Sequence, residues 1–363
     1  MQLKRGMSAE EIRDNLSTNE GVGFFFSATS WKSLGQFLDN AGPKSKMLED
    51  FLWNLGPFID SPIRIDNKIV GANIIWPLPV PLWLGSKKAI RRFRESHYIA
   101  GLKLAEKCGI RMVSLGAAIP YLSSYGKLDK GGSNVGITVG HTASVYFLRQ
   151  ILIKVVNHLS LKLDRVKIAI FGAAGTIGWI LSNEIAKLRP NHLILIDLKK
   201  TKGSLNRLTA DILGKGFSSL SNHIFTDSAS LPDFDGAVIV STSSVPYLTE
   251  EALLKSFFWI DDSHPRSVSL EAERSTKGKT LYLECYARGP DGFDAGFPFE
   301  LPSKQDTYAC FTEGWLAWKE GHVGDFYTGS ADSSSIDKMS PEILKCGFSV
   351  GPLIGKDGHM LLE

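Results

Sequence analysis

Cysteine is scarce in this sequence: the 363 residues include four, Cys108, Cys285, Cys310 and Cys346. No two of them form a Cys-x-x-Cys pair, which is a spacing common in zinc and redox sites. So few cysteines exclude a disulfide scaffold, argue against a zinc site and favour a reducing compartment. We therefore expect no metal site and a cytoplasmic protein.

An excess of one charge and long apolar runs are also lacking. The chain has 41 Lys and Arg against 38 Asp and Glu, a net charge of +3, which excludes a strongly basic nucleic-acid-binding coat. The first 17 residues, MQLKRGMSAEEIRDNLS, have no apolar core of a secretory signal. The most apolar stretch, residues 69–84, is too short to span a bilayer and contains three prolines. It predicts a loop that lines an apolar site, touches a membrane surface or packs in the core.

The residues that are present predict a globular α/β protein. Apolar residues make up 43% and charged residues 22%, which fits a folded chain of about two domains. Apolar runs at 166–171, 192–196, 237–240 and 257–260 read as buried strands, with helical patterns between them. Strands that alternate with helices predict a doubly wound, Rossmann-like parallel sheet.

The rest of the chain predicts further elements around this sheet. Residues 21–27, 112–116 and 136–139 read as buried strands, and residues 87–108 as a helix that ends at Gly109. Helices are also predicted near 307–319 and 341–346. The expected organisation is an α/β domain over 1–140, the Rossmann-like domain over 141–290 and a helical segment over 291–363.

A glycine-rich turn follows the first strand of the predicted sheet. Gly172 permits a tight turn, Gly175 lets a pyrophosphate approach the backbone, and Gly178 lets the helix pack close to the strand. The free amides of the helix N-terminus bind the anion. A dinucleotide site is the prediction, and a plain strand–turn–helix is the alternative. The expected cofactor-binding residues are Gly172, Ala173, Ala174, Gly175, Thr176, Ile177 and Gly178, with Asp197.

Asp197 bears on the choice of cofactor. It ends the second strand of the sheet, 19 residues after Gly178, where an acid accepts hydrogen bonds from the adenosine ribose and repels a 2′-phosphate. This position favours NADH. Three lysines follow at 199, 200 and 202 and offer a site for that phosphate, so NADPH stays open.

Cys310 lies near the predicted start of a C-terminal helix. Ser303, Asp306 and Thr307 are plausible N-caps for this helix. A helix N-terminus and a nearby Lys304 would favour the thiolate, which is the nucleophilic form of cysteine. Cys310 is thus a candidate nucleophile, and an inert core cysteine is the alternative.

Basic residues gather on the helix predicted at 87–108. They offer either an ordinary solvated face or a docking surface for an acidic partner. They are Lys87, Lys88, Arg91, Arg92 and Arg94. His141 and His264 lie beside strand ends, where they act either as local hydrogen-bonding residues or as bases.

Several blocks, in order, resemble the long-chain acyl-(acyl-carrier-protein) reductases best known from cyanobacteria. The resemblance runs from about residue 21 to residue 352. The blocks are AEKCGIRMVSLGAA (105–118), TVGHTA (138–143), FGAAGTIG (171–178), WIDDSHP (259–265), LPSKQDTYACFTE (301–313) and KCGF (345–348).

This resemblance implies a substrate domain, a Rossmann-like middle domain and a helical C-terminal part. It also implies an acyl-thioester on the cysteine of the ACF block, Cys310, and hydride from NADPH that releases an aldehyde. The chain departs from the family at Asp197, at Ala174 and Thr176 of the glycine turn, and in its proline-rich segment.

The expected function is therefore the reduction of an acyl thioester to an aldehyde. The expected substrate is carried by coenzyme A or by an acyl carrier protein that docks on residues 87–94. One alternative is an NAD(P)-dependent dehydrogenase of a small hydroxy or carbonyl compound with no covalent step. Another is a non-catalytic protein that binds a dinucleotide or a carrier.

Overall fold

The chain forms two compact units. The computed structural model describes residues 2–3, 6–27, 34, 37–39, 44–83, 86–226, 231, 236–242, 249–264, 266–276, 279–297, 299, 301–329, 333–354 and 360–362. Unit 1 comprises Met1–Ala143, Ala287–Ser330 and Met339–Ser349, and unit 2 comprises Ser144–Tyr286, Ala331–Lys338 and Val350–Glu363. Residues 291–363, set apart as one segment in the sequence-based division, are shared between the two units.

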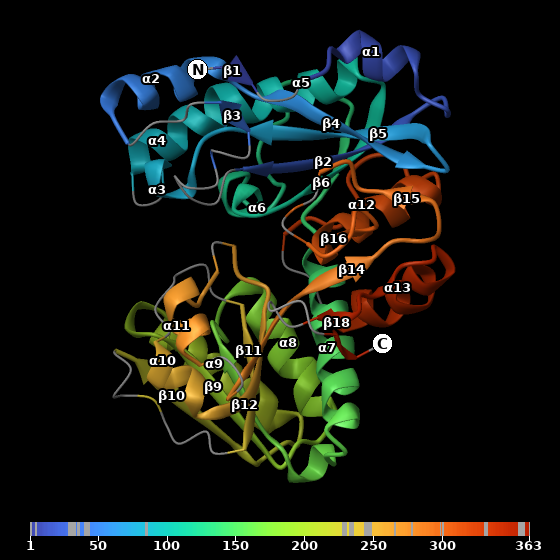
Figure 1. Ribbon diagram of the computed structural model, residues 1–363. Coiled ribbons are helices and arrows are strands. Elements are labelled where there is room, and N and C mark those ends of the chain that lie inside the picture. Colours follow the sequence, from blue (N-terminus) through green and yellow to red (C-terminus); the bar gives the residue numbers. More distant parts are fainter. Residues whose placement is uncertain are drawn as a thin grey trace. The chain divides into compact units, whose positions relative to one another are not determined.

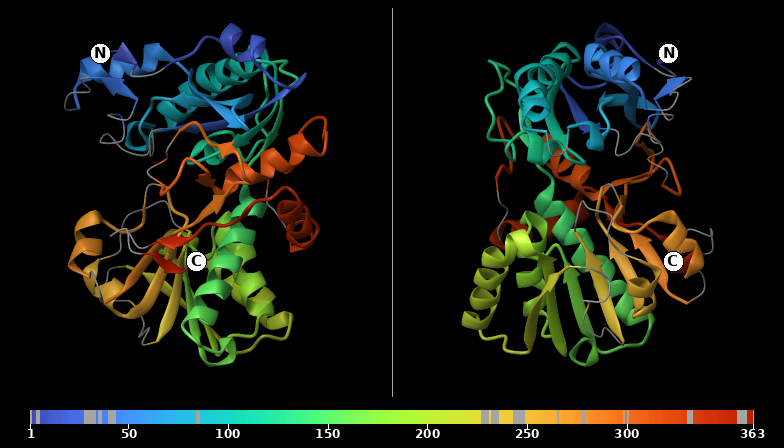
Figure 2. Two further views of the ribbon diagram at one scale, coloured as in Figure 1. Left: turned by 45° about the vertical axis from the view of Figure 1, so that its right-hand side comes forward. Right: turned by 90° about the vertical axis from the view of Figure 1, so that its left-hand side faces the viewer.

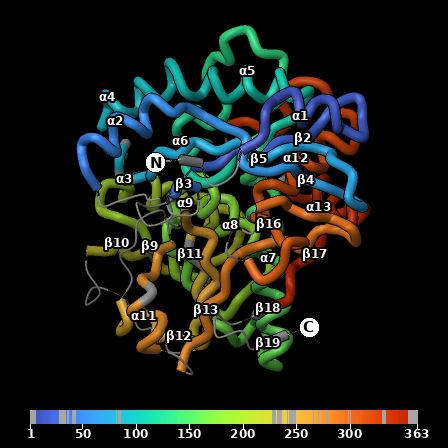
Figure 3. Tube along the Cα trace, turned by 45° about the horizontal axis from the view of Figure 1, so that its top comes forward, coloured from blue at the N-terminus to red at the C-terminus, as the bar shows by residue number. Residues whose placement is uncertain are grey.

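Unit 2 is built on a six-stranded parallel sheet. The strands are β8 (Lys167–Phe171), β9 (His192–Leu198), β10 (Leu220–Phe225), β11 (Ala237–Ser241), β12 (Ser256–Asp261) and β13 (Leu281–Glu284). They lie in the order β10-β9-β8-β11-β12-β13, and every neighbouring pair is parallel. Figure 3 shows β10 and β9 side by side at one edge of this sheet. Numbered along the chain, this is the order 3-2-1-4-5-6 of the doubly wound Rossmann sheet. The predicted fold class is confirmed.

Helices cover both faces of this sheet. The connecting helices are α8 (Thr176–Lys187), α9 (Lys202–Gly214), α10 (Glu250–Leu254) and α11 (Leu270–Ser275). Because parallel crossovers are right-handed, α8 and α9 lie on one face and α10 and α11 on the other. The right-hand view of Figure 2 shows α9 and α11 on either side of the strands. The inner strands β8 and β9 are largely apolar because both of their faces are buried, whereas the edge strand β10 carries polar residues and is only partly buried.

Unit 1 contains a mixed sheet. Its strands are β2 (Gly21–Ser27), β4 (Phe58–Ile65), β5 (Lys68–Trp76), β6 (Ile110–Leu115), β7 (Gly136–Thr138) and β15 (Phe293–Asp294), in the order β15-β4-β5-β2-β6-β7. The four strands from β5 to β7 are parallel, whereas β4 is antiparallel to β5 and β15. The strands predicted at 21–27, 112–116 and 136–139 are confirmed.

Alternate residues of β2 bury their side chains on opposite faces of the unit 1 sheet. Phe25 packs against Trp76 with 4.7 Å between ring centroids, and Phe24 packs against Phe311 of α12 (Ala309–Lys319) at 5.4 Å. Figure 1 shows α5 (Ile99–Lys107) and α12 on the two faces of this sheet. Residue 310, on α12, is thus anchored to the central strands of unit 1.

The helix predicted at 87–108 is one continuous helical stretch with an irregular centre. It consists of α4 (Lys87–Arg92), a π-helical turn (Phe93–Tyr98) and α5, and Gly109 follows with a φ of +74°. The Trp76 indole donates to the carbonyl oxygen of His97 at 2.9 Å. A side chain that takes a helical carbonyl interrupts the regular hydrogen bonding of the helix, which accounts for the π-helical turn.

Two sequence-based assignments need correction. Residues 69–76 do not form a loop but most of β5, a strand inside the sheet, because their apolar side chains are buried on both faces. Leu78 and Val80 after it are buried as well. The helix predicted at 341–346 begins earlier, as α13 (Ser333–Lys345) with Pro341 inside it.

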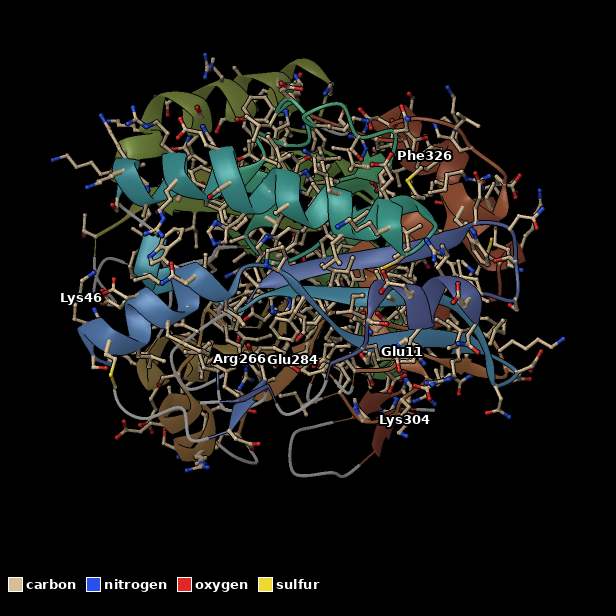
Figure 4. The ribbon with its side chains drawn as sticks, turned by 90° about the horizontal axis from the view of Figure 1, so that it is seen from above. Glu11, Lys46, Arg266, Glu284, Lys304 and Phe326 are labelled. Carbon is tan, nitrogen blue, oxygen red and sulfur yellow. The ribbon has the colours of Figure 1, made fainter. Side chains whose placement is uncertain are left out.

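The remaining elements are mostly short, apart from the 18-residue helix α7 (His141–His158). Glu11, labelled in Figure 4, closes a capping box with Ser8 at the start of α1. The helices are α1 (Ala9–Asp14), α2 (Lys46–Leu55), α3 (Val80–Trp83), α6 (Ile119–Leu122) and α7 (His141–His158), with 3₁₀ turns at Leu163–Arg165 and Lys199–Thr201. The strands are β1 (Gln2–Leu3), β3 (Leu38–Asp39), β14 (Tyr286–Arg288), β16 (Asp306–Tyr308), β17 (Ser349–Val350), β18 (Leu353–Ile354) and β19 (Met360–Leu362). Among the described residues, no helix combines the length and the apolar composition needed to cross a bilayer.

Candidate functional site

The glycine turn of unit 2 joins β8 to α8. Gly172 has a φ of +73°, a left-handed conformation that favours glycine. A Cβ on Gly178 would lie 2.1 Å from the carbonyl oxygen of Gly172, so any side chain there would separate the helix from the turn. The predicted roles of these two glycines, a tight turn and close helix packing, match their geometry.

The first turn of α8 faces the edge of the sheet where ligands bind in this fold. Its N-cap is Gly175, and no side chain caps the helix within the described residues. The amides of Ala173, Ala174 and Gly175 are bonded within the protein, to Ile196, Asp197 and Gly172. The first-turn amides at 176–178 therefore provide the N–H groups for an anion. They lie where the strand order reverses between β8 and β11.

Asp197 is the penultimate residue of β9, one residue before the strand ends, and its carboxylate is hydrogen-bonded within the protein. One oxygen accepts from the amide of Ala174 at 2.7 Å. The other accepts from the amide of Leu198 and the hydroxyl of Thr201, both at 2.7 Å. Three donors occupy most of the roughly four acceptor positions of a carboxylate. Asp197 thus fixes the glycine turn, and its contact with a ribose stays a prediction.

The neighbouring strands β11 and β12 also end in polar residues. Thr242, directly after β11, donates to the carbonyl oxygen of Phe171 at 3.1 Å. Asp261 is buried and accepts from Ser263, Ser267 and Tyr282. Burial and the adjacent Asp261 charge raise the pKa of Asp262 to about 7. The carboxyl edge of the sheet therefore carries an acid that titrates near neutrality, which the sequence did not single out.

A separate cavity of about 410 Å³ opens at the other edge of unit 2. Its lining includes Lys187, Arg189 and Lys215. Lys187 pairs with Glu184 and Lys215 with Asp211, at 2.6 and 2.7 Å. The cavity lies near the ends of α8 and α9 and away from the glycine turn, so it is not part of the predicted dinucleotide site. Elsewhere in unit 2, Arg266 and Glu284, both labelled in Figure 4, form an ion pair at 3.1 Å.

In unit 1, Cys310 is the second residue of α12 and is half-buried. The predicted N-caps are wrong: the cap position is Tyr308, and no side chain caps the helix within the described residues. Residues 306–308 instead form β16, and Asp306 accepts two hydrogen bonds from Arg288, at 2.8 and 3.0 Å. Figure 4 labels Lys304, whose carbonyl oxygen accepts from the amide of Ala295. That Lys304 favours the thiolate of Cys310 stays a prediction.

The turn between β7 and α7 packs directly against Cys310. Gly140 in this turn has a φ of +72°, and a Cβ there would lie 2.3 Å from the Cβ of Cys310. Both its conformation and its contact therefore require glycine. The TVGHTA and ACF blocks, about 170 residues apart in the sequence, meet at this point.

Glu313 joins the same turn to α12. It is fully buried and accepts from the hydroxyl of Thr138 and from the amides of Gly140, Thr142 and Ala143. Burial raises the pKa of Glu313 to about 7, against the effect of the four donors. Sequence reasoning missed this residue. The available signal was an acid within the apolar helical stretch ACFTEGWLAW.

His141, the first residue of α7, lies next to Gly140. It is 7% exposed, and its ring lies 5.7 Å from that of Tyr125. Burial lowers its pKa to about 4, although the backbone of Gly329 hydrogen-bonds the ring, so the imidazole is neutral at physiological pH. Among the described residues, its Nδ1 has no hydrogen-bond partner, and neither has the buried hydroxyl of Thr142. Both alternatives, a local hydrogen-bonding residue and a base, remain open for His141.

The basic residues of α4 and the π-helical turn after it do not all point to solvent. Arg94 donates to the carbonyl oxygen of Leu122 at 2.6 Å, and the Arg92 guanidinium lies 4.5 Å from the centre of the Trp53 ring. The exposed set is Lys87, Lys88, Arg91 and Arg92. Arg94, one of the five basic residues named from the sequence, is therefore not part of the exposed set.

Comparisons with solved structures find dehydrogenases that are similar to parts of this chain at low identity. No protein-family model and no curated protein matches the chain. The lactate dehydrogenase of Trichomonas vaginalis, in complex with NADH and oxamate, is 22% identical over 32% of this chain and 45% of that chain, with a TM-score of 0.26. A glutamate dehydrogenase is 10% identical over 90% and 73% of the two chains (TM-score 0.44), and the L-tryptophan dehydrogenase of Nostoc punctiforme is 10% identical over 90% and 89% (TM-score 0.37).

Proposed function

We propose that this protein is a nicotinamide-dependent oxidoreductase that reduces an acyl thioester to an aldehyde through an acyl-enzyme on Cys310. The observation that carries the proposal is the position of Cys310. It is the second residue of a helix that no described side chain caps, and it packs against a left-handed glycine in the TVGHTA block. A helix N-terminus favours the thiolate, which attacks thioester carbonyls readily.

The other cysteines are poorer candidates. Burial raises the pKa of Cys108 to about 12 and also raises that of Cys346. Cys285 is 1% exposed, so a substrate cannot reach it in the folded protein. These three thiols serve as internal controls for the assignment of Cys310.

The cofactor in this proposal is NADH or NADPH, held by the glycine turn and the first-turn amides of α8. The support is the combination of a 3-2-1-4-5-6 sheet, a left-handed Gly172 and, at the reversal of strand order, a helix start that no described side chain caps. When bound, the nicotinamide supplies the hydride.

The reaction proceeds in two balanced steps. The Cys310 sulfur forms a bond to the acyl carbon and the carrier thiol leaves with the proton, which conserves the thioester. Hydride then adds to that carbon, the Cys310 thiolate leaves, and an aldehyde forms. One proton from solvent restores the Cys310 thiol. The carrier is coenzyme A or an acyl carrier protein, and Lys87, Lys88 and Arg91 offer positive charge to an acidic carrier.

The mass of the intact protein after incubation with acyl thioesters in the absence of reductant tests this proposal. We expect one acyl adduct on Cys310 of the parent and of the Cys108→Ser, Cys285→Ser and Cys346→Ser variants. Cys310→Ser replaces the thiol by a hydroxyl that is almost never ionised at neutral pH, so the adduct and aldehyde production should both disappear while cofactor binding remains.

Two results would contradict the covalent mechanism. Near-parent turnover by Cys310→Ser, or an adduct that maps to another cysteine, would remove Cys310 from the reaction. Hydride transfer to a small carbonyl compound without any adduct would instead support a dehydrogenase without a covalent step. Dinucleotide binding with neither adduct nor turnover would indicate a non-catalytic binding protein.

A further inference from the structure

Glu313 lies one turn after Cys310 on α12. Residues three apart project from the same side of a helix, so the carboxylate and the thiol face the same neighbour. That neighbour is the turn at residues 138–143. Glu313 is 0% exposed, and nothing in the two-step reaction requires a buried acid at this place.

The hydrogen bonds of Glu313 exclude a role as a base. Oε1 accepts from the hydroxyl of Thr138 and, at 2.9 Å, from the amide of Gly140. Oε2 accepts from the amides of Thr142 and Ala143 at 3.0 and 3.2 Å. Four donors fill the roughly four acceptor positions of a carboxylate, so none is left to take a proton from a thiol.

All four donors belong to the turn that packs on Cys310. The amides of Thr142 and Ala143 are in the first turn of α7, where a negative charge is favourable. The Glu313 carboxylate therefore caps the N-terminus of α7, as an N-cap side chain would, although it belongs to another helix, α12. With the turn held in this way, Gly140 stays in contact with the Cβ of Cys310.

We infer that Glu313 is a positioning residue: it holds the turn at 138–143 against Cys310 and thereby sets how the thiol meets an acyl group. This inference rests on the proposed function of Cys310. Without Glu313, four donors lose their acceptor, the turn can move, and the acyl carbonyl is no longer confined beside the sulfur.

Glu313→Gln tests the inference because it keeps the shape and replaces one acceptor oxygen by an NH₂ group that opposes the backbone donors. We expect the acylation rate constant at saturating thioester to fall about 10- to 100-fold, as misplacement of reacting groups does. The half-saturating concentration should stay within about twofold, since the variant alters alignment rather than binding.

Glu184→Gln is the matched control. Glu184 is also a fully buried carboxylate, which accepts from Arg149 at 3.3 Å and from Lys187 at 2.6 Å, but it lies in unit 2 and away from the glycine turn. It should lose stability as Glu313→Gln does and still acylate Cys310 at the parent rate. A parent acylation rate in Glu313→Gln, or an equal loss in both variants, would overturn the inference.

Amide hydrogen exchange and alkylation separate this inference from the function on which it rests. In Glu313→Gln, exchange at 140, 142 and 143 should accelerate, and iodoacetamide should label Cys310 at least as fast as in the parent, while Cys108 and Cys285 stay protected. Unchanged exchange in this turn, or labelling of all three cysteines, would reject the positioning role even if the parent forms an adduct. If the parent forms no adduct but the turn and Cys310 respond as described, the proposed function fails, and Glu313 still holds the turn at 138–143 against Cys310.

Discussion

At the residue scale, each unit contains a carboxylate that accepts hydrogen bonds from the backbone amides of a turn. Asp197 holds the amide of Ala174 in the glycine turn, and Glu313 holds three amides of the turn beside Cys310. The sequence predicts the glycine turn of unit 2 from a local pattern, whereas Gly140 enters the sequence analysis only as part of the TVGHTA block. The sequence does not show the Glu313 contact, because this acid lies 173 residues from Gly140. Local geometry was therefore predictable at the glycine turn, and the long-range polar partners of the other turn were not.

The position of Asp197 leads to a prediction about cofactor binding. Asp197→Ala removes the acceptor of the Ala174 amide and of the Thr201 hydroxyl, so the turn loosens and the Kd for NADH should rise about tenfold, the loss of one hydrogen bond to a charged group. The exposed lysines at 199, 200 and 202 remain. The preference for NADH over NADPH should therefore narrow or reverse.

Titration of NADH and NADPH against the parent and the variant, followed by nicotinamide fluorescence, measures the two Kd values and their ratio. Thr201→Val, which removes one donor and leaves the carboxylate, is the control and should retain most of the NADH affinity. A parent that strongly prefers NADPH would show that the lysines outweigh the carboxylate or that Asp197 serves the turn alone.

At the element scale, the sequence predicts the strands and long helices well because their patterns are strong and local. Examples are β2, β8, β9 and the helical stretch from residue 87 to residue 107. The failures come from competing partners. Asp306 looks like an N-cap but pairs with Arg288, and the residues around it join a strand. Residues 69–84 look like a loop because they were read as one segment. The structure divides them into a strand, β5, and the prolines that follow it.

The start of α8 is the element that the proposed cofactor needs. Gly175→Val would put a branched side chain at the N-cap, where a Cβ lies 3.1 Å from the carbonyl oxygen of Gly172 and beside the first-turn amides. We expect dinucleotide affinity to fall at least about tenfold because the anion loses its approach to those amides, while the far-UV circular dichroism stays unchanged.

Gly214→Val is the matched control for this substitution. Gly214 ends α9, and a Cβ there has no neighbour within 4 Å, so affinity should match the parent. Calorimetric titration with NADH and NADPH measures both variants. Unchanged affinity for both cofactors in a folded Gly175→Val protein would remove the glycine turn from the cofactor site.

At the scale of the whole molecule, chain order and spatial order differ. The sequence-based segments are consecutive, whereas unit 1 gathers three separate stretches, including α12 and its cysteine. The reason is packing: Phe311 and Trp315 are buried in the unit 1 core. Contacts of this kind leave no periodic pattern that points to their partner. Each unit therefore has its own buried titratable groups and its own response to pH.

In unit 1, the response to acid should depend on His141. Burial lowers its pKa to about 4 from 6.5, so the unfolded chain binds a proton between these values and the folded chain does not. Its contribution to stability is thus present above pH 6.5 and is lost as the pH falls towards 4. His97 has the same sign, whereas Glu313, with its raised pKa, gains relative stability as the pH falls below about 7.

A His141→Gln variant isolates the histidine, because the other groups titrate equally in both proteins. Between pH 7 and pH 5, the free energy of unfolding of unit 1 should fall by about 2 kcal/mol more in the parent than in the variant. Urea unfolding at both pH values, followed by amide exchange in β6, measures the difference. An equal change in the two proteins would mean that His141 is protonated within the folded unit near its ordinary pKa.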